Sequence, residues 1–251
     1  MLKLKNGVRR RLRGGERGKN LDFHGAYAYC NGQITHSEAA GMAQPLVSIL
    51  MATYNRAELL PRAVESVLLQ SWHNWEFLIV DDGSTDSSAE LLGEFAAIDG
   101  RIRVLTQPNA GPARSRNRAL RESCGDLVTV LDSDDAYAAD HLALRVSYMI
   151  NHPEIDFLHG GFRAIGSDAQ MMIPDVHDPS RQVPLEECIV GGTFFAREGV
   201  IERAGGWEGG YGEDARLFAR ISAMYRVRRV DFPTYLYHRD TIDSRCSQLG
   251  R

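Results

Sequence analysis

The predicted fold is decided by the stretch Trp75-Glu-Phe-Leu-Ile-Val-Asp-Asp-Gly-Ser84. Its apolar run is short, contains β-branched and aromatic residues and ends in an acidic turn, which is the pattern of a strand buried inside a sheet. Two more apolar runs end in polar residues in the same way: 46–51 before Thr53-Tyr54, and 127–131 before Asp132-Ser-Asp-Asp135.

Helical periodicity separates these expected strands. Apolar residues recur at helical spacing over residues 59–68, and Ser87 or Ser88 can cap the helix that follows the second strand. The remaining expectations are helices near 112–121 and 140–151, and strands at 102–105 and 155–159. This alternation predicts an α/β fold with a mostly parallel central sheet. Ligands of such sheets bind at the carboxyl ends of the strands, so the polar turns are expected to meet at one edge.

The pattern loosens after Gly160, where a smaller second region is expected. A loop is expected at residues 171–183, which are rich in Pro and Asp. The other expectations are a strand at 192–196, helices at 197–203 and 213–224, and extended segments at 227–230 and 235–238.

Charge is distributed unevenly along the 251 residues. The formal net charge of −4 does not favour nucleic acid as a partner, but residues 1–41 hold eight Lys or Arg against three acidic residues and carry +5. Such an arm is either a solvated tail or a contact for phosphates or an anionic membrane surface. The sequence has no apolar stretch of transmembrane length, no secretory signal and no Cys-x-x-Cys pair. These features favour a cytoplasmic protein, with peripheral contact at the inner face of the membrane as an open option.

The acidic turns supply the first candidate chemistry. Carboxylates at positions i and i+2 just after a strand, as in Asp132 and Asp134, suit a hard divalent cation that also binds phosphate oxygens. The alternative is an acidic capping turn. Asp82 either accepts a hydrogen bond from a nucleobase N–H or forms an Asx turn.

Three further groups are candidates. Arg116 lies in the first turns of an expected helix, where an arginine suits a phosphate or else belongs to an exposed basic face. Asp214, next to Glu213, follows a glycine-rich segment at 205–212 and either takes a proton from a hydroxyl or complements a helix dipole. His238 either touches a metal or phosphate or is structural.

Several other enzyme classes are disfavoured. Gly14-Gly-Glu-Arg-Gly-Lys19 is one residue short of a phosphate loop, and no strand pattern precedes it. No G-x-G-x-x-G opens a helix after the first strand, and no G-x-S-x-G nucleophile elbow is present. The histidines form no H-x-x-x-H or His/Cys cluster, which disfavours a zinc site.

A resemblance to family 2 glycosyltransferases covers about residues 45–245. The amino-terminal half carries it closely, through Val47-Ser-Ile-Leu-Met-Ala-Thr-Tyr-Asn-Arg56, Ser66-Val-Leu-Leu-Gln-Ser71, Trp75-Glu-Phe-Leu-Ile-Val-Asp-Asp-Gly-Ser-Thr-Asp86, 111–120 and 125–135. The carboxyl-terminal half carries it more thinly, through Gly205-Gly-Trp207, Glu213-Asp214, Arg220 and Tyr237-His238.

The resemblance implies a GT-A fold and a metal-dependent, inverting transfer of one sugar from a nucleotide-diphosphate donor to an acceptor hydroxyl. By this resemblance, Thr53, Tyr54 and Asp82 would hold the nucleoside. Arg116 would lie near the donor, and Asp132 would contact the ribose or the metal.

The remaining implied roles concern the cation and the acceptor. Asp134 would bind Mn or Mg most directly, and His238 would assist at the metal or the diphosphate. Asp214 would be the general base, and Trp207 and Glu213 would lie on the acceptor side.

The resemblance also divides the chain. Residues 1–43 are expected to be a basic, disordered extension that matches nothing in the family, and 246–251 a tail. Residues 44–245 are expected to form a single domain, with a nucleotide-binding half at 44–135 and an acceptor-binding half at 136–245.

Two alternatives from other functional classes stay open. The chain can be a non-catalytic scaffold that binds a nucleotide sugar, although the intact D-x-D and Glu-Asp pairs argue against this. A sugar-phosphate nucleotidyltransferase is disfavoured, because Ala52-Thr-Tyr-Asn-Arg56 is not its glycine- and arginine-rich first loop. The Q-x-x-R-W signature of processive synthases is absent, which favours single-sugar transfer to a glycan, lipid-linked or small-molecule acceptor.

Overall fold

The computed structural model describes residues 44–167, 171–175, 178 and 180–240. The predicted extension at 1–43 and tail at 246–251 lie outside the described residues. Among the helices that are described, none combines the length and apolar character that a membrane crossing requires.

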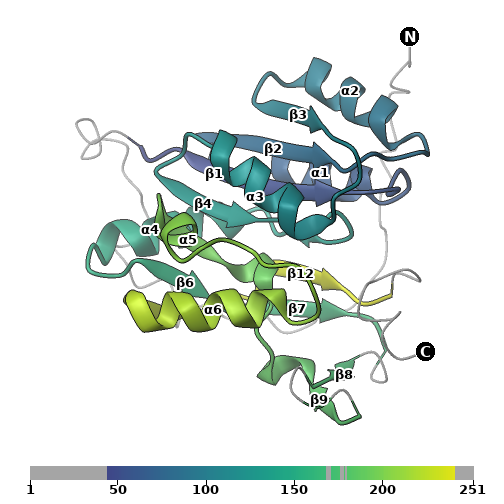
Figure 1. The fold of residues 1–251 in the computed structure, drawn as a ribbon. Helices are drawn as coiled ribbons and strands as arrows, with labels where there is room; N and C mark the ends of the chain where they lie inside the picture. The colour runs from purple at the N-terminus through teal and green to yellow at the C-terminus, as the bar shows by residue number, and fades with distance from the viewer. Residues whose placement is uncertain (1–43, 168–170, 176–177, 179, 241–251) are drawn as a thin grey trace, which may run out of the picture. The chain divides into compact units, whose positions relative to one another are not determined.

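The described part of the chain is built around a seven-stranded sheet in the order β11-β6-β10-β4-β1-β2-β3 (Figure 1). The pairs β1–β2, β1–β4, β2–β3 and β6–β11 are parallel, and β10 is antiparallel to both of its neighbours. The expected mostly parallel sheet is therefore confirmed. Its strands are β1 (Val47–Thr53), β2 (Trp75–Asp81), β3 (Ile102–Thr106), β4 (Leu127–Val130), β6 (Phe157–His159), β10 (Phe195–Arg197) and β11 (Val227–Arg229).

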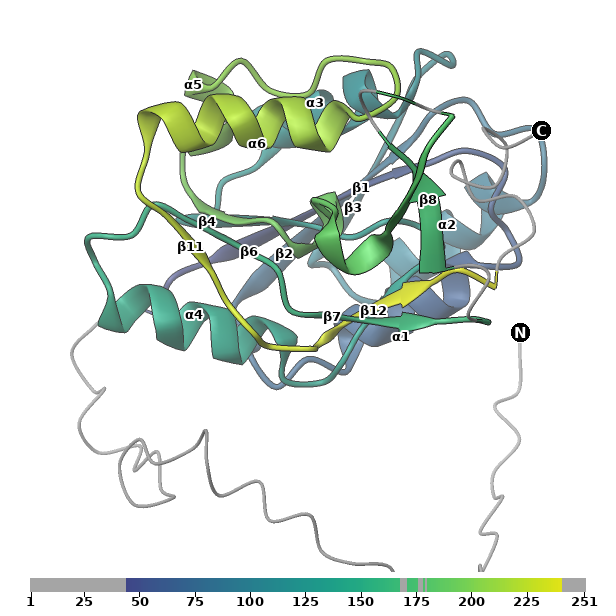
Figure 2. The same ribbon diagram turned by 90° about the horizontal axis from the view of Figure 1, so that it is seen from below.

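Helices cover both faces of this sheet (Figure 2). One face carries α1 (Leu60–Leu68), α2 (Ser88–Ile98) and α4 (His141–Asn151), and the other carries α3 (Pro112–Glu122), α5 (Val200–Arg203) and α6 (Glu213–Met224). Side chains alternate across a strand, so Ile49 and Met51 enter the first core and Leu50 enters the second. All three are fully buried, and each such side chain contributes about 1.5–3 kcal/mol.

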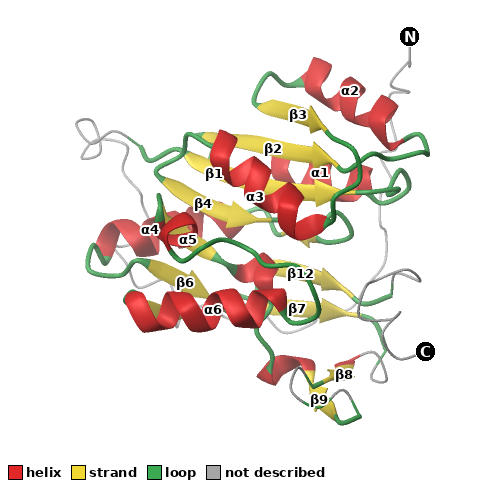
Figure 3. Ribbon diagram, in the orientation of Figure 1, coloured by secondary structure: helices red, strands yellow, loops and turns green. Residues whose placement is uncertain are grey.

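Two small sheets complete the described region (Figure 3). One has the order β5-β12-β7, from β5 (Ala136–Tyr137), β12 (Tyr235–His238) and β7 (Phe162–Ile165). The other is a pair formed by β8 (Met172–Pro174) and β9 (Gln182–Pro184). The expected loop at 171–183 was therefore wrong in part, because strands this short carry too little periodicity to be recognised.

The stretch before β10 also differs from expectation. Gly191–Thr193 forms the 3-10 turn η3, so the strand expected at 192–196 begins only at Phe195. A second 3-10 turn, η2, spans Leu185–Glu187. The η3 turn matters for the site because its glycines allow close approach of two side chains, as described below.

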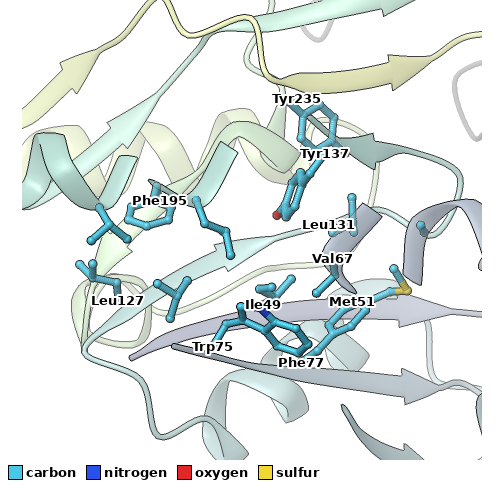
Figure 4. Packing of buried hydrophobic residues seen from close by; sticks show 14 of the residues in the cluster. Ile49, Met51, Val67, Trp75, Phe77, Leu127, Leu131, Tyr137, Phe195 and Tyr235 are labelled. Carbon is cyan, nitrogen blue, oxygen red and sulfur yellow. The ribbon is translucent and has the colours of Figure 1, made fainter. Parts of the chain in front are cut away.

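Aromatic packing joins the small sheet to the large one. Tyr137 and Tyr235 lie next to one another beyond Leu131, at the end of β4 (Figure 4), with ring centroids 5.9 Å apart. Both rings are buried in the same core cluster as Ile49 and Met51. This packing fixes β12, and with it His238, beside the acidic turn that follows β4.

Candidate active site

The turns after β1 and β2 are joined by hydrogen bonds. Thr53 pairs with Asp81 in the parallel register, so both turns leave the same edge of the sheet. Asn55 has φ 51°, a conformation that L-residues adopt infrequently, and its side-chain oxygen accepts the N–H of Thr85 at 2.8 Å. Thr53 is 3 % exposed, whereas Tyr54 is 43 % exposed and presents its ring at this edge.

Neither serine caps α2 in the way the sequence suggested. The helix has no side-chain cap from Ser87, and the N–H of Ser88 donates instead to Asp86 Oδ1 at 2.9 Å. The hydroxyl of Ser88 accepts the N–H of Arg56 at 2.9 Å. The serine is thus used to hold the loop after β1 rather than the helix end.

Asp82 is held by the loop that leads into α3. Its Oδ1 accepts hydrogen bonds from Gln107 Nε2 at 2.7 Å and the Ala110 N–H at 2.9 Å, and its Oδ2 accepts the Gly111 N–H at 2.8 Å. Burial raises the pKa of Asp82, but these hydrogen bonds outweigh it and the pKa lies below its ordinary value. The Asx-type turn is made by its neighbour, because the Ser84 N–H donates to Asp81 Oδ1 at 3.1 Å.

The turn after β4 gathers three carboxylates with different partners. Asp132 Oδ1 receives Arg116 Nη2 at 2.6 Å. Asp135 is fully buried and accepts the hydroxyl of Tyr235 at 2.5 Å and the N–H of His238 at 2.7 Å. At Asp134 the hydrogen bond from Arg62 goes to the backbone oxygen, not to the carboxylate.

This crowding changes the acidity of the turn. Burial first, and then the charge of Asp132, raises the pKa of Asp134. The pKa of Asp135 is raised well above its ordinary value by burial and then by Asp134 and Asp132. An added cation would relieve this mutual repulsion.

Arg62 is a site residue that the sequence interpretation missed. Besides the Asp134 oxygen, its guanidinium contacts Nδ1 of His238 at 3.1 Å. Burial and the Arg62 charge lower the pKa of His238, so this imidazole is neutral at pH 7. Arg62 lies outside the apolar stripe of α1, and nothing in that periodicity marks it as a site residue.

Arg116 joins the two halves of the domain. Its side chain is 10 % exposed and pairs with Asp132 at 2.6 Å and with Glu213 Oε1 at 2.5 Å. Burial lowers the pKa of Arg116, but the charges of Asp132, Asp214 and Glu213 raise it by more than burial lowers it. The guanidinium therefore keeps its positive charge. The structure thus places Arg116 between an acid of the β4 turn and an acid of α6.

Asp214 lies one residue further along α6 in a confined position. The indole Nε1–H of Trp207 donates to Asp214 Oδ1 at 3.0 Å. A Cβ added at Gly191 would lie 2.2 Å from the Asp214 Cγ, so only glycine fits beneath this carboxylate. Burial raises the pKa of Asp214 to about 6, against the opposing effect of Arg116.

Two residues expected on the acceptor side lie beneath the surface. Trp207 is 3 % exposed and Glu213 is 6 % exposed, and their polar groups engage Asp214 and Arg116. We therefore assign them to holding the site rather than to touching an acceptor. The sequence interpretation also missed Asn117 and Tyr235, because their partners lie far along the chain.

The described residues offer few side chains that could bind a divalent cation. No group of three or more His, Cys, Asp or Glu side chains suited to a metal ion is assembled within residues 44–167, 171–175, 178 and 180–240. The donor set nevertheless fits a cation shared with a diphosphate, which needs only one or two carboxylates from the protein. Asp134, with its raised pKa and acidic neighbours, meets that requirement.

Comparisons with known proteins identify the family of the chain. The family model described as "Glycosyl transferase family 2" matches residues 48–190. An uncharacterized glycosyltransferase of Haemophilus influenzae is 40 % identical over 164 residues, which is 64 % of each chain. The putative teichuronic acid biosynthesis glycosyltransferase TuaG of Bacillus subtilis is 36 % identical over 59 % of this chain and 60 % of its own.

A third relative has a more specific name. The UDP-Glc:alpha-D-GlcNAc-diphosphoundecaprenol beta-1,3-glucosyltransferase WfgD of Escherichia coli is 38 % identical over 49 % of this chain and 48 % of its own. The matched region thus spans between about half and just under two thirds of these relatives.

Solved structures share the fold. TarS residues 1–349 of S. aureus in complex with UDP-GlcNAc has a TM-score of 0.64 at 18 % identity, over 80 % of this chain and 60 % of that one. The mannosyltransferase PcManGT of Pyrobaculum calidifontis, in complex with GDP-Man and Mn2+, has a TM-score of 0.62 at 21 % identity, over 78 % and 57 %. With the GT-A architecture and more than half of its residues matched, the chain belongs to glycosyl transferase family 2.

Proposed function

We propose that the protein transfers one sugar from a nucleotide-diphosphate sugar to an acceptor hydroxyl, with inversion and with Asp214 as the general base. The observation that carries the proposal is the Asp132–Arg116–Glu213 bridge, which holds the residue next to Asp214 beside the acidic turn of β4. A base and a donor site that are tied together in this way suit a single-displacement reaction.

The nucleoside is held at the ends of β1 and β2. Tyr54 offers an exposed ring, and Thr53 lies directly before it. Asp82 stays ionised because hydrogen bonds from Gln107 and from the Ala110 and Gly111 N–H groups stabilise its charge, and Ser115 adds to this effect. A buried anionic acceptor at this position favours a base that presents an N–H.

A divalent cation, Mn or Mg, would be held by Asp134, with His238 as the second candidate ligand. When bound, it offsets charge on the departing diphosphate. Arg62 faces Nδ1 of His238, which leaves only Nε2 of that ring for a metal or phosphate. The Mn2+ in the complex of the similarly folded mannosyltransferase supports a divalent cation, without bearing on which residues hold it.

Asp214 takes the proton from the acceptor hydroxyl. The freed oxygen attacks the anomeric carbon from the face opposite the diphosphate, a new C–O bond forms, and the bond to the diphosphate oxygen breaks. The pKa of about 6 suits this role, because the carboxylate is ionised at pH 7 yet basic enough to accept a proton. Trp207 orients it with a neutral hydrogen bond.

The acceptor assignment draws on the names of two relatives. The names of TuaG and WfgD refer to teichuronic acid and to a diphosphoundecaprenol-linked sugar. By analogy we propose a glycan or lipid-linked acceptor in polysaccharide assembly. The basic arm that would contact a membrane lies outside the described residues.

A thermal-shift panel of nucleotide sugars with and without Mn tests the donor assignment. A donor at 100 times its dissociation constant adds about 2.7 kcal/mol to the free energy of unfolding, which is enough to rank bases and sugars. Asp134→Ala should lose the Mn-dependent part of that shift. Failure of every donor to shift the wild-type protein contradicts the proposal, and binding without turnover identifies a non-catalytic binder.

A further inference from the structure

We propose that Asn117 of α3 is a positioning residue for Asp214, which acts by fixing the backbone of Trp207. This inference rests on the proposed role of Asp214 as the base. The hydrogen bonds of the Asn117 carboxamide go to the backbone of Trp207. Asn117 thus determines the position of Asp214 through Trp207.

The carboxamide of Asn117 uses both of its polar atoms on one residue. Asn117 Nδ2 donates to the carbonyl oxygen of Trp207 at 2.8 Å, and the N–H of Trp207 donates to Asn117 Oδ1 at 2.9 Å. This two-point contact restrains both position and rotation of the Trp207 backbone. Only an amide side chain of this length offers a donor and an acceptor side by side.

The neighbouring glycine shows how closely the loop lies on α3. Gly206 has φ +67°, and a Cβ added there would lie 2.5 Å from Asn117 Oδ1. The left-handed backbone and the missing side chain therefore let the loop at 205–207 press against Asn117.

The backbone of Trp207 in turn determines the position of the indole N–H. The ring is 3 % exposed and belongs to the buried apolar cluster between α3, α5 and α6. A packed ring with two side-chain torsions has little freedom, so its Nε1–H follows the backbone. That N–H donates to Asp214 Oδ1 at 3.0 Å, which completes the connection from α3 to the base.

The preceding residue reinforces this connection from the other side. Arg116 pairs with Glu213, which is adjacent to Asp214 on α6, and with Asp132. Two consecutive residues of α3 thus hold Asp214, one through charge and one through a neutral amide. The charged groups that act on Asp214 are Arg116, Asp132 and Glu213, and Asn117 changes none of them.

The experiment uses Asn117→Asp, which keeps the shape and the acceptor but removes the donor to Trp207. We expect kcat, measured as release of nucleoside diphosphate from the best donor of the panel, to fall about 10- to 100-fold. The dissociation constant of UDP with Mn, measured by calorimetry, should stay within about twofold. The matched control is Asn74→Asp, at a remote asparagine that donates to the Gln44 carbonyl, and kcat should not change there.

Two further variants keep the test decisive. If Asn117→Asp does not fold, Asn117→Ser removes both contacts without adding a charge, and the same selective loss of kcat is expected. Trp207→Phe removes the indole N–H together with the five-membered part of the buried ring. Because that N–H lowers the pKa of Asp214, its loss should raise this pKa and move the acid limb of the kcat profile to higher pH.

The outcomes separate the hypotheses. Unchanged kcat in both Asn117 variants, or an unshifted acid limb in Trp207→Phe, overturns the positioning role. Parallel loss of kcat, UDP affinity and melting temperature overturns it in favour of a merely structural role. A wild-type protein that binds donors but turns over none contradicts the proposed function instead.

Discussion

Asp82, directly after β2, and Asp214, in the first turn of α6, are both largely enclosed aspartates, yet their surroundings shift their pKa values in opposite directions. Asp82 accepts hydrogen bonds from Gln107 and from the Ala110 and Gly111 N–H groups, and together with Ser115 these hold its pKa below the ordinary value. Asp214 has the single indole hydrogen bond of Trp207 and, despite the charge of Arg116, a pKa of about 6.

Burial disfavours the ionised form of both carboxyl groups, and the two sites differ in how many hydrogen bonds compensate for it. A carboxylate that receives several N–H groups becomes a fixed anion, suited to binding. One that is buried with few donors keeps its affinity for a proton, suited to general-base catalysis. Under the proposed function, the same residue type would therefore serve binding after β2 and proton transfer at the start of α6.

The largest expected effect is on turnover when the base is neutralised. Asp214→Asn keeps an oxygen for the Trp207 indole but cannot take a proton, so kcat should fall by about 10²–10⁴. UDP binding with Mn should be retained, as measured by calorimetry. Asp156→Asn, at a half-buried carboxylate that accepts the Arg226 N–H, serves as control. Wild-type turnover by Asp214→Asn would remove Asp214 from the mechanism.

The bridge between the halves is expected to matter next, for stability. Arg116→Met leaves Glu213 buried without its cation and should lower the free energy of unfolding by about 3–5 kcal/mol, measured by urea denaturation. The double variant Arg116→Met with Glu213→Gln removes that buried charge and should recover part of the loss. No recovery would mean that Arg116 contributes through packing rather than through the ion pair.

A methyl group added at Gly191, beneath Asp214, should lower kcat more than it lowers the free energy of unfolding. Gly191→Ala forces Asp214 to move, because the new Cβ would lie 2.2 Å from its Cγ, and kcat should fall about 100-fold. The control Gly93→Ala adds a Cβ with nothing within 4 Å in α2 and should stabilise the protein by about 0.5–1 kcal/mol. Equal kcat values for the two variants would contradict the confined position of Asp214.

The smallest effect concerns pH. Because Asp214 must be ionised, kcat/KM should rise about tenfold per pH unit up to about 6 and then level off. The free energy of unfolding should fall over the same pH range. The folded-state pKa of Asp214 lies above the ordinary 3.8, so this group contributes its full stabilisation below about pH 4 and loses it as the pH rises through 6. Asp214→Asn should therefore melt higher than wild type at pH 8, and a lower melting temperature would contradict this.

Much of the fold of residues 44–135 follows from local patterns. The apolar runs that became β1, β2 and β4, and the helical spacing that became α1 and α3, are properties of neighbouring residues. The polar turns follow at the carboxyl ends by the geometry of parallel strands alone. For this reason Asp82, Asp132 and Asp134 were recognisable as candidates before their surroundings were known.

The sequence by itself determined the candidates Asp82, Asp132, Asp134, Arg116 and Asp214 and the elements on which or after which they stand. Only the tertiary structure decided what surrounds them: that Arg116 reaches Glu213 across 97 residues, that Asn117 holds Trp207, and that Trp207 faces Asp214 from below the surface. Periodicity and turn chemistry are encoded within a few residues, whereas the acidity of a carboxyl group depends on atoms that packing brings from distant parts of the chain.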